Sequence, residues 1–308
     1  MGKTNHQQTR ELEGKRWFHG RTMKKQERTT IILFLTIPLL LLFVFTYLPL
    51  ADMIRYSFYK WDGYSQMKWI GLKNYETVFT KPEYLSSLAT SIYYFIGSLI
   101  QIALALFFST IFCYKMRGRN FFKGVLFFPS LMNGVAIGFA FLYFFKGYGT
   151  LDTIVMAFGV PKENIPLWLG NVNLINISLT FVSVWRYMGQ NMVMFSGATQ
   201  SISGDYFEAA QLDGANKWQQ FWHIILPNIR GVVALNLILA MKGAISVYEI
   251  PFVMTTGSGG SMTYVIKTLQ TAFTGRKIGL ASALGVVLLV IVLIISVIQK
   301  RFIEGRED

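Results

Sequence analysis

Three ionisable residues stand inside long apolar segments of this 308-residue sequence. Arg186 lies near the middle of segment 174–196, Lys242 lies near the middle of segment 232–254, and Glu249 follows seven residues later. A charge at the centre of a membrane-spanning helix costs about 2.5–3.5 kcal/mol on insertion scales, so such side chains face protein or water. On one continuous helix, Lys242 and Glu249 would share a face, about 10 Å apart along the axis. The three residues indicate either a polar pathway or an ion pair, Arg186–Glu249 or Lys242–Glu249, that only holds helices together.

Polar and aromatic neighbours favour the pathway. Tyr187 and Gln190 lie within about one turn of Arg186, and Ser246 adds a hydroxyl to the second segment. Hydrogen-bonding groups beside aromatic faces suit a hydroxylated solute such as a sugar. If Glu249 pairs with one cation, the other is left uncompensated, which raises the hypothesis of an acidic saccharide. A carboxylate supplied by a partner subunit would instead leave the site neutral.

Other chemistries lack the residues they need. The sequence contains no Gly-x-x-x-x-Gly-Lys-Ser/Thr run, and the glycine-rich stretch 257–261 has no lysine, so the chain holds no ATP-binding loop of that kind. Cys113 is the single cysteine, and the scattered His6, His19 and His223 predict no metal site. No nucleophile–base pair supports a membrane enzyme. The net charge of +13 comes without a base-reading motif, so we expect no nucleic-acid binding.

A polar stretch at about 203–227, between two apolar segments, is expected to fold as a docking element. Asp205 and Glu208 have the spacing of a capping box, and Gly214 is a natural helix stop. An apolar stripe at helical spacing follows, made of Trp218, Phe221, Trp222 and Ile225. Pro227 then suits the first turn of the next helix. The pattern predicts a helix, a glycine turn and a second helix, with an apolar stripe that needs a partner.

The spacing of this stretch resembles the cytoplasmic signature loop of permease subunits of binding-protein-dependent ABC importers. The matching pattern is Glu208-Ala209-Ala210, three residues ending at Asp213, then Gly214, and later Ile225-x-Pro227. The resemblance covers roughly residues 30–305. Tyr248-Glu249 and the glycines of 257–260 are similar to the carbohydrate-importer branch. Ser203 and Ser261 stand where that family often has proline, and neither changes the spacing of the loop.

The resemblance implies the site residues. In the family the loop inserts into a groove of an ATPase subunit, which implies contacts from Glu208, Ala209, Ala210, Asp213, Gly214, Trp218 and Pro227. In related sugar permeases the two charged spans line a midplane cavity, which implies Arg186, Tyr187, Gln190, Gly243 and Val247. Lys242, Ser246 and Glu249 complete the predicted pathway.

The resemblance also implies partners. We expect a second homologous permease, two ATPase subunits that bind ATP and magnesium, and an extracytoplasmic solute-binding protein that delivers a sugar. The expected sugar is an oligosaccharide. This chain is then a non-catalytic transport subunit that binds no cofactor itself. The alternative function is an ion-coupled secondary transporter that uses Arg186, Lys242 and Glu249 as a relay.

Six apolar segments are each long enough to cross about 30 Å of hydrocarbon. They are 29–47, 88–114, 125–145, 174–196, 232–254 and 278–298. They lack the alternation of barrel strands, so helices are expected. The sequence therefore predicts an all-α membrane protein of six transmembrane helices, the type I ABC importer permease fold. A single domain, 29–305, follows an N-terminal tail, 1–28.

Lysine and arginine cluster before the first segment and in the loop after the second. By the positive-inside rule both regions are cytoplasmic, and an even number of spans returns the C-terminus to that side. The connections 48–87, 146–173 and 255–277 are then external. Aromatic residues within 52–86 suit the membrane–water boundary, with solute contact as the alternative. The expected location is the cytoplasmic (inner) membrane of a bacterium or an archaeon.

Overall fold

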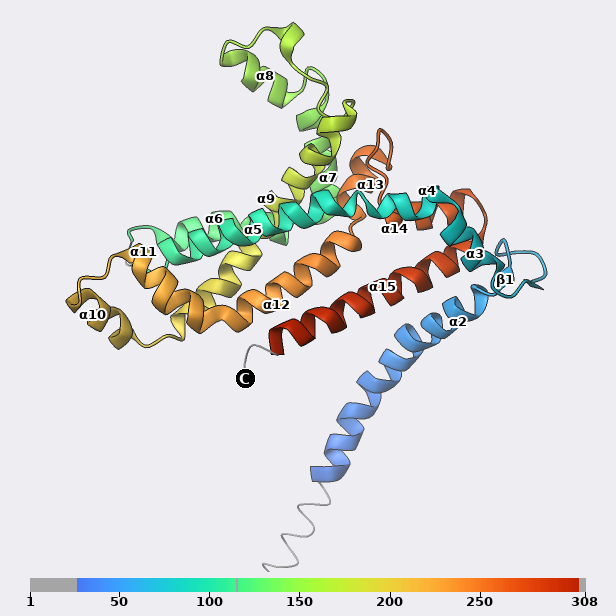
Figure 1. Ribbon diagram of the computed structural model, residues 1–308, viewed down its shortest axis with the longest axis horizontal. Helices are drawn as coiled ribbons and strands as arrows, with labels where there is room; N and C mark the ends of the chain where they lie inside the picture. Colours follow the sequence, from blue (N-terminus) through green and yellow to red (C-terminus); the bar gives the residue numbers. More distant parts are fainter. Residues whose placement is uncertain (1–26, 115, 305–308) are drawn as a thin grey trace, which may run out of the picture. The chain divides into compact units, whose positions relative to one another are not determined.

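The computed structural model describes residues 27–114 and 116–304, with the side chains of 300 and 302–304 left aside. The predicted tail, 1–28, therefore lies outside the described residues except for Glu27 and Arg28. The chain divides into two units, Met1–Arg55 and Tyr56–Asp308. Figure 1 labels the helices and strands of the two units.

The described part of the first unit belongs to one long apolar helix, Glu27–Tyr56, whose last residue opens the second unit. A π-helical turn, η1 (Phe43–Tyr47), leads into α2 (Leu48–Tyr56). The turn lies just before Pro49, which has no N–H to donate, so the hydrogen-bond ladder is already irregular there. The helix is longer than the predicted segment 29–47, and its apolar side chains are exposed, as suits contact with lipid.

The second unit is helical apart from one short antiparallel pair. Strand β1 (Tyr59–Lys60) pairs with β2 (Lys68–Trp69), and Tyr59 lies opposite Trp69. The sequence did not predict this hairpin. The helices before residue 203 are α3 (Lys73–Thr80), α4 (Pro82–Leu85), η2 (Ser86–Leu88), α5 (Ser91–Ile111), α6 (Arg119–Leu131), α7 (Gly134–Phe145), α8 (Thr150–Ala157), η3 (Lys162–Asn164) and α9 (Val172–Gln200). The remaining ones are α10 (Gly204–Leu212), α11 (Lys217–Gln220), η4 (Phe221–Ile225), α12 (Leu226–Ile245), α13 (Glu249–Thr255), α14 (Tyr264–Leu269), η5 (Gln270–Thr274) and α15 (Ile278–Glu304).

The core of the second unit is built around α9. This helix packs along α5, and α6 and α12 also contact it. Leu179 and Val182 belong to one buried cluster with residues of α5, α7, α12 and α13, whereas Met192 and Phe195 belong to another with α5, η4 and α12. A third cluster joins α3, α4, α14 and α15. The polar residues of α9 are therefore held on a frame of fully buried apolar contacts.

The third apolar segment, 125–145, is bent, and the sequence did not predict the bend. Helices α6 and α7 meet at 98° across the break at Met132 and Asn133. Pro129 lies in the last turn of α6, and the Asn133 side chain caps α7 by accepting the Val135 N–H at 2.8 Å. A proline followed by a capping asparagine favours a helix stop and restart.

The fifth apolar segment is broken as well. Helix α12 ends at Ile245 and α13 begins at Glu249, with Ser246–Tyr248 non-helical between them. Lys242 and Glu249 therefore do not lie on one continuous helix, and the expectation that they share a face is wrong. Proteins tolerate such non-helical backbone at membrane depth only where it is buried in protein or lines a cavity.

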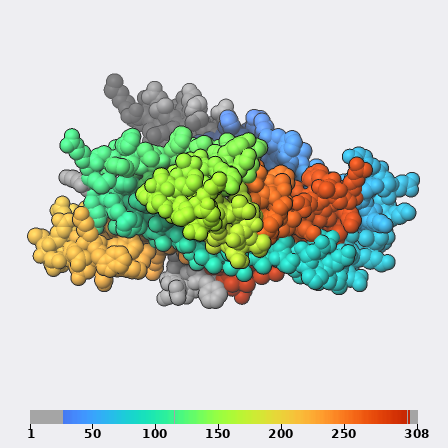
Figure 2. Space-filling model, turned by 90° about the horizontal axis from the view of Figure 1, so that it is seen from above, coloured from blue at the N-terminus to red at the C-terminus, as the bar shows by residue number. Residues whose placement is uncertain are grey.

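Four helices in the described part of the chain are long and apolar enough to cross a membrane, and counting the bent pair as one span makes five. The predicted fourth segment coincides with α9, which has 29 residues but carries a row of polar side chains. The count of six remains a prediction. Within the second unit, α10 and α11 lie at the opposite end from the β1 hairpin in both views (Figures 1 and 2).

Candidate functional site

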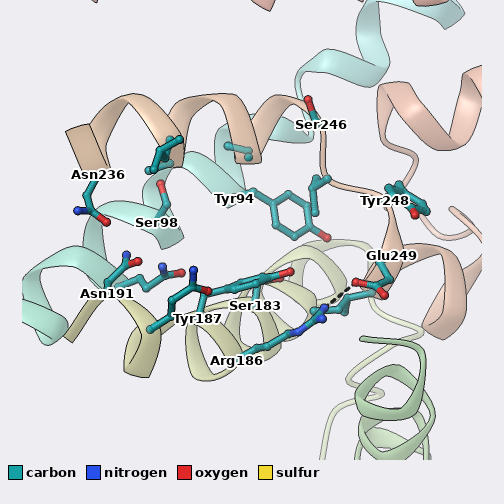
Figure 3. A pocket seen from close by; sticks show the side chains of 18 of the residues that line it. Tyr94, Ser98, Ser183, Arg186, Tyr187, Asn191, Asn236, Ser246, Tyr248 and Glu249 are labelled. Atoms are coloured by element: carbon teal, nitrogen blue, oxygen red, sulfur yellow. Dashed lines mark hydrogen bonds and ion pairs between the residues drawn. The ribbon is translucent and has the colours of Figure 1, made fainter. Parts of the chain in front are cut away.

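Three helices of the second unit each turn one face toward a cavity of about 410 Å³. Helix α5 contributes Tyr94, Ser98 and Gln101, which are spaced four and three residues apart. Helix α9 contributes Ser183, Arg186, Tyr187, Gln190, Asn191 and Met194. Helix α12, the break after it and the start of α13 contribute Asn236, Leu239, Ala240, Gly243, Ala244, Ser246, Val247, Tyr248, Glu249 and Ile250. The three- and four-residue spacing puts the residues of α5, of α9 and of α12 each on one helical face. The cavity wall is a mixture of hydroxyls, amides and aromatic rings (Figure 3).

An ion pair closes one end of the cavity. Arg186 Nη1 lies 2.6 Å from Glu249 Oε2, and Arg186 Nη2 lies 3.4 Å from the carbonyl oxygen of Met132. The two side chains are 11% and 31% exposed, and the guanidinium lies 4.9 Å from the ring centroid of Tyr187. Arg186 thus connects α9 both to the start of α13 and to the break between α6 and α7. The Met132 carbonyl there has few helical partners, because it lies just past the end of α6.

Gly134 makes room for this ion pair. A β-carbon at Gly134, the first residue of α7, would overlap Arg186 Nη1 and the carboxylate of Glu249. Without a side chain, the first turn of α7 can lie directly against the pair.

The hydroxyl of Tyr94 has no hydrogen-bond partner in the part of the chain that the structure describes. Tyr94 is 4% exposed and projects into the cavity with its hydroxyl on the side of Glu249 (Figure 3). A buried hydroxyl without a partner costs about 1–3 kcal/mol. It is therefore placed to bind a polar group that occupies the cavity.

The cavity gathers most of the predicted pathway residues. Its wall includes Arg186, Tyr187, Gln190, Gly243, Ser246, Val247 and Glu249. Lys242 is exposed and does not line the cavity, because α12 turns its neighbours Gly243 and Ala244 inward instead. Sequence reasoning missed the wall formed by α5, namely Tyr94, Ser98 and Gln101. The spacing of Tyr94, Ser98 and Gln101 within an otherwise apolar segment was a usable signal.

The docking loop, residues 203–227, folds as helix, glycine turn and helix. Its caps differ from the prediction: Ser203 caps α10 by accepting the Asp205 N–H, and the capping box joins Asn216 and Gln219 rather than Asp205 and Glu208. Gly214 has a φ of +80° between the two helices. Of the predicted contact residues, Glu208, Ala209, Asp213, Trp218 and Pro227 are exposed, and Ala210 is half-buried.

The apolar stripe of the docking loop divides in two. Ile225 is fully buried and Phe221 packs beside it on the bundle, whereas Trp218 is 67% exposed and Trp222 is 47% exposed. The ring centroids of the two tryptophans lie 5.6 Å apart. Pro227 does stand in the first turn of α12, but α11, η4 and α12 follow one another without a break, so it does not close the loop.

Tyr114 connects the docking loop to α5. Its hydroxyl donates to Gln220 Oε1 at 3.0 Å, and Lys217 Nζ lies 4.7 Å from its ring centroid. Gln220 is 2% exposed and donates to the Ala215 carbonyl oxygen. The turn that follows α5 is therefore in direct contact with α11.

Residues 101–306 match the family described as binding-protein-dependent transport system inner membrane component. The chain belongs to this family. The permease is 30% identical to a probable ABC transporter permease protein of Bacillus subtilis over 93% of this chain and all of that one. It is 29% identical to a probable starch degradation products transport system permease protein of Thermoanaerobacterium thermosulfurigenes, over 89% of this chain and 94% of that one.

The fold of the permease matches that of a solved ABC importer. A bacterial alginate ABC transporter, solved in complex with an alginate pentasaccharide-bound periplasmic protein, aligns with a TM-score of 0.77 at 17% identity, covering 91% of this chain and 96% of that one. The permease therefore has the type I ABC importer fold and is a membrane transport subunit rather than an enzyme. Within the described residues, no group of three His, Cys, Asp or Glu side chains could hold a metal ion. The family membership does not favour the ion-coupled transporter.

Proposed function

We propose that the permease carries a saccharide through the cavity between α5, α9 and α12. The observation that supports this is the cavity wall, where hydroxyls and amides lie beside tyrosine rings around about 410 Å³. Such a wall offers the hydrogen bonds and apolar faces that a sugar needs. Curated relatives are named for starch degradation products and for multiple sugars, which supports the same solute class.

An acidic saccharide receives no unpaired cation from this cavity. Arg186 is paired with Glu249, and Lys242 lies outside the lining. The hypothesis of an acidic solute therefore depends on cations from a second permease. The alginate transporter, which has the same fold, imports an acidic polysaccharide. A neutral oligosaccharide is the solute that this chain's own side chains fit best.

The permease would work as one of two homologous membrane subunits with two ATPase copies. ATP and magnesium would be bound by the ATPases, and the exposed faces of Glu208 and Trp218 would contact them. An extracytoplasmic solute-binding protein would deliver the sugar. The termini would both be cytoplasmic, with the docking loop on that side and residues 48–87 and 255–277 outside.

Reconstitution tests this function. The permease, co-expressed with its partner permease and ATPase, is placed in proteoliposomes with a candidate binding protein. ATP hydrolysis is then measured with matched neutral and carboxylated oligosaccharides. We expect one neutral oligosaccharide to stimulate hydrolysis and to accumulate. Stimulation by carboxylated sugars alone would overturn the neutral assignment, and stimulation by none would overturn the saccharide assignment.

Cysteine labelling tests the orientation independently. In a Cys113→Ser background, Ser65→Cys and Ser258→Cys should react with an impermeant thiol reagent from outside intact cells. Asn216→Cys should react only after permeabilisation. All three positions are exposed, so lack of access cannot explain a negative result. Labelling of Asn216→Cys from outside would overturn the topology and the ATPase docking with it.

A further inference from the structure

A second cavity of about 410 Å³ lies at the hairpin end of the second unit. The β1–β2 hairpin, α3 and the segment between η5 and α15 form its walls. Six cationic side chains line it: Lys60, Lys68, Lys73, Lys81, Arg276 and Lys277. We call it the basic pocket. No part of the proposed saccharide route includes it.

The charge of the basic pocket is not neutralised within the permease. None of its six cations forms an ion pair in the part of the chain that the structure describes. The neighbouring Lys267 does, because its Nζ lies 2.8 Å from Glu83 Oε2. The same surface thus pairs one lysine with a carboxylate and leaves six cations around one concavity. Like charges held together repel each other, so an anion is favoured between them.

The single carboxylate in the wall of the basic pocket is engaged by its own turn. Asp62 Oδ1 accepts the N–H of Tyr64 at 3.0 Å, the N–H of Ser65 at 2.8 Å and the Ser65 hydroxyl at 2.9 Å. These bonds lower the pKa of Asp62 to about 2. Asp62 therefore shapes the hairpin loop and makes no ion pair with the lysines.

The walls of the basic pocket are fixed before any ligand binds. The Asn74 side-chain amide donates to the carbonyl oxygens of Ser57 at 2.8 Å and Tyr59 at 2.9 Å. The N–H of Gly279 donates to the Trp61 carbonyl oxygen at 3.1 Å, which joins the hairpin to the start of α15. Arg276 has a left-handed φ of 49°, an unfavourable conformation for a side-chain-bearing residue. The backbone of the pocket wall is held by these bonds, so it loses little freedom when a ligand binds.

The basic pocket lies where a membrane span begins. Lys277 directly precedes Ile278–Gln299, a candidate span with a mean hydropathy of 3.1, and Leu280 within that span lines the pocket. On the hairpin, Tyr64 is 91% exposed and Trp69 is 65% exposed, as expected of aromatic residues at the membrane–water boundary. This placement is the one expected of cations at the depth of lipid headgroups. We call Ile70, Tyr84 and Leu280, the apolar residues of the lining, the apolar floor.

We propose that the basic pocket binds the phosphate headgroup of an anionic phospholipid. A concave wall with cations at the rim and Leu280 and Tyr84 in its lining fits a phosphate that continues into an apolar chain. The flat acidic face of a soluble protein would leave the concavity unfilled. A free acidic saccharide would gain nothing from the apolar floor.

Lysine labelling of the full-length permease in lipid nanodiscs tests the proposal. One nanodisc contains phosphatidylcholine alone, and the other contains about one-fifth phosphatidylglycerol. Peptide-resolved reaction with an amine reagent is followed at Lys60, Lys68 and Lys73, with exposed Lys146 as the internal control. We expect the anionic lipid to slow labelling in the pocket about threefold or more, the factor reached once a ligand exceeds twice its dissociation constant. Lys146 should change little.

Three outcomes would overturn the proposal. Equal labelling in both nanodiscs would show that no anionic lipid binds. Equal protection by inorganic phosphate in phosphatidylcholine alone would identify a free anion instead. Protection that requires a binding protein or a carboxylated oligosaccharide would identify that protein or that sugar as the ligand.

A second experiment counts bound lipids by native mass spectrometry. We expect less phosphatidylglycerol on the variant Lys60→Gln/Lys73→Gln/Lys277→Gln than on the charge-matched variant Arg117→Gln/Lys146→Gln/Arg230→Gln.

Discussion

The docking loop and the cavity obey different rules, although α12 runs from one to the other. The loop is local: residues close in sequence fold it, and it presents Glu208 and Trp218 to solvent. The cavity is assembled from α5, α9, α12 and α13, and its ion pair joins residues 63 positions apart. The docking loop thus offers an exposed surface, whereas the cavity depends on two helix breaks within the second unit. Substitutions in the docking loop and substitutions in the cavity should therefore have separate consequences.

The largest effect is expected from breaking the cavity's ion pair. Arg186→Met leaves Glu249 without its partner, and removing one member of a buried pair costs about 3–5 kcal/mol. The 31% exposure of Glu249 places the cost at the lower end. Uptake of the oligosaccharide identified by reconstitution should be lost, while co-purification of the ATPase persists.

Two companion variants sharpen this result. Arg230→Met removes an exposed arginine of α12 and should transport normally. The double variant Arg186→Met/Glu249→Met should regain part of the thermal stability, because no charge is left unpaired, yet should remain inactive. Normal uptake by Arg186→Met alone would mean that the pair has no part in transport.

The second effect tests the glycine beneath the pair. Gly134→Ala places a methyl group where Arg186 Nη1 and the Glu249 carboxylate lie, so the pair must separate or α7 must shift. We expect uptake to fall about tenfold, as for a loss of about 1.4 kcal/mol. Gly124→Ala in α6 is the matched control, since its β-carbon would meet nothing within 4 Å. Equal uptake by the two variants would contradict the close approach.

The third effect should appear at the docking loop and spare the cavity. A β-carbon at Gly214 meets nothing within 4 Å, so Gly214→Val acts through its φ of +80° and costs about 1–2 kcal/mol. In both Gly214→Val and Glu208→Lys, ATPase co-purification and solute-stimulated hydrolysis should decline. Gly204→Ala, also in open space but at an ordinary φ, should resemble the unaltered permease. Full stimulation in Gly214→Val would show that the loop does not couple the subunits.

The smallest effect probes the contact between the two regions. Tyr114→Phe removes the hydroxyl that donates to Gln220 but keeps the ring beside Lys217. A neutral hydrogen bond contributes about 1 kcal/mol, so ATPase binding should hold while stimulated hydrolysis falls a few-fold. Tyr143→Phe, an exposed tyrosine on α7, is the control. Unchanged hydrolysis in Tyr114→Phe would leave the loop and the cavity connected through α12 alone.

The same contrast explains what the sequence could predict. The docking loop was predictable because Gly214, the tryptophan spacing and Pro227 are local signals. Two details differ: the capping box joins Asn216 and Gln219, and the chain continues through Pro227 into α12 without a break. The cavity was predictable in part: residues of α9 and of segment 232–254 marked two walls, and the α5 wall was missed. The breaks were missed because 125–145 and 232–254 are both apolar enough to cross a membrane, and hydropathy does not distinguish a straight span from a bent one. Pro129 and Asn133 were the overlooked signs.

The ion-pair partner of Glu249 could not be predicted for a different reason. The choice between Arg186 and Lys242 depended on the fold at Ser246–Tyr248. A continuous helix through those residues would put Lys242 on the same face as Glu249, but the break separates them. Tyr94 was overlooked because a tyrosine in an apolar helix resembles ordinary packing. Its unpartnered hydroxyl becomes visible only when α5 lies against α9.

The uninterrupted passage from α11 through η4 into α12 acts as a lever. The 4, 5 and 20 residues of these elements form a rod about 40 Å long at 1.5 Å per residue. Trp218 lies near one end of the rod and Gly243 lies near the other. A tilt of about ten degrees about one end would move the far end about 7 Å, by the length of the rod alone. Helices bend most easily at a π-helical turn. We therefore expect the stiffness of Phe221–Ile225 to determine how much of a displacement at Trp218 reaches Gly243.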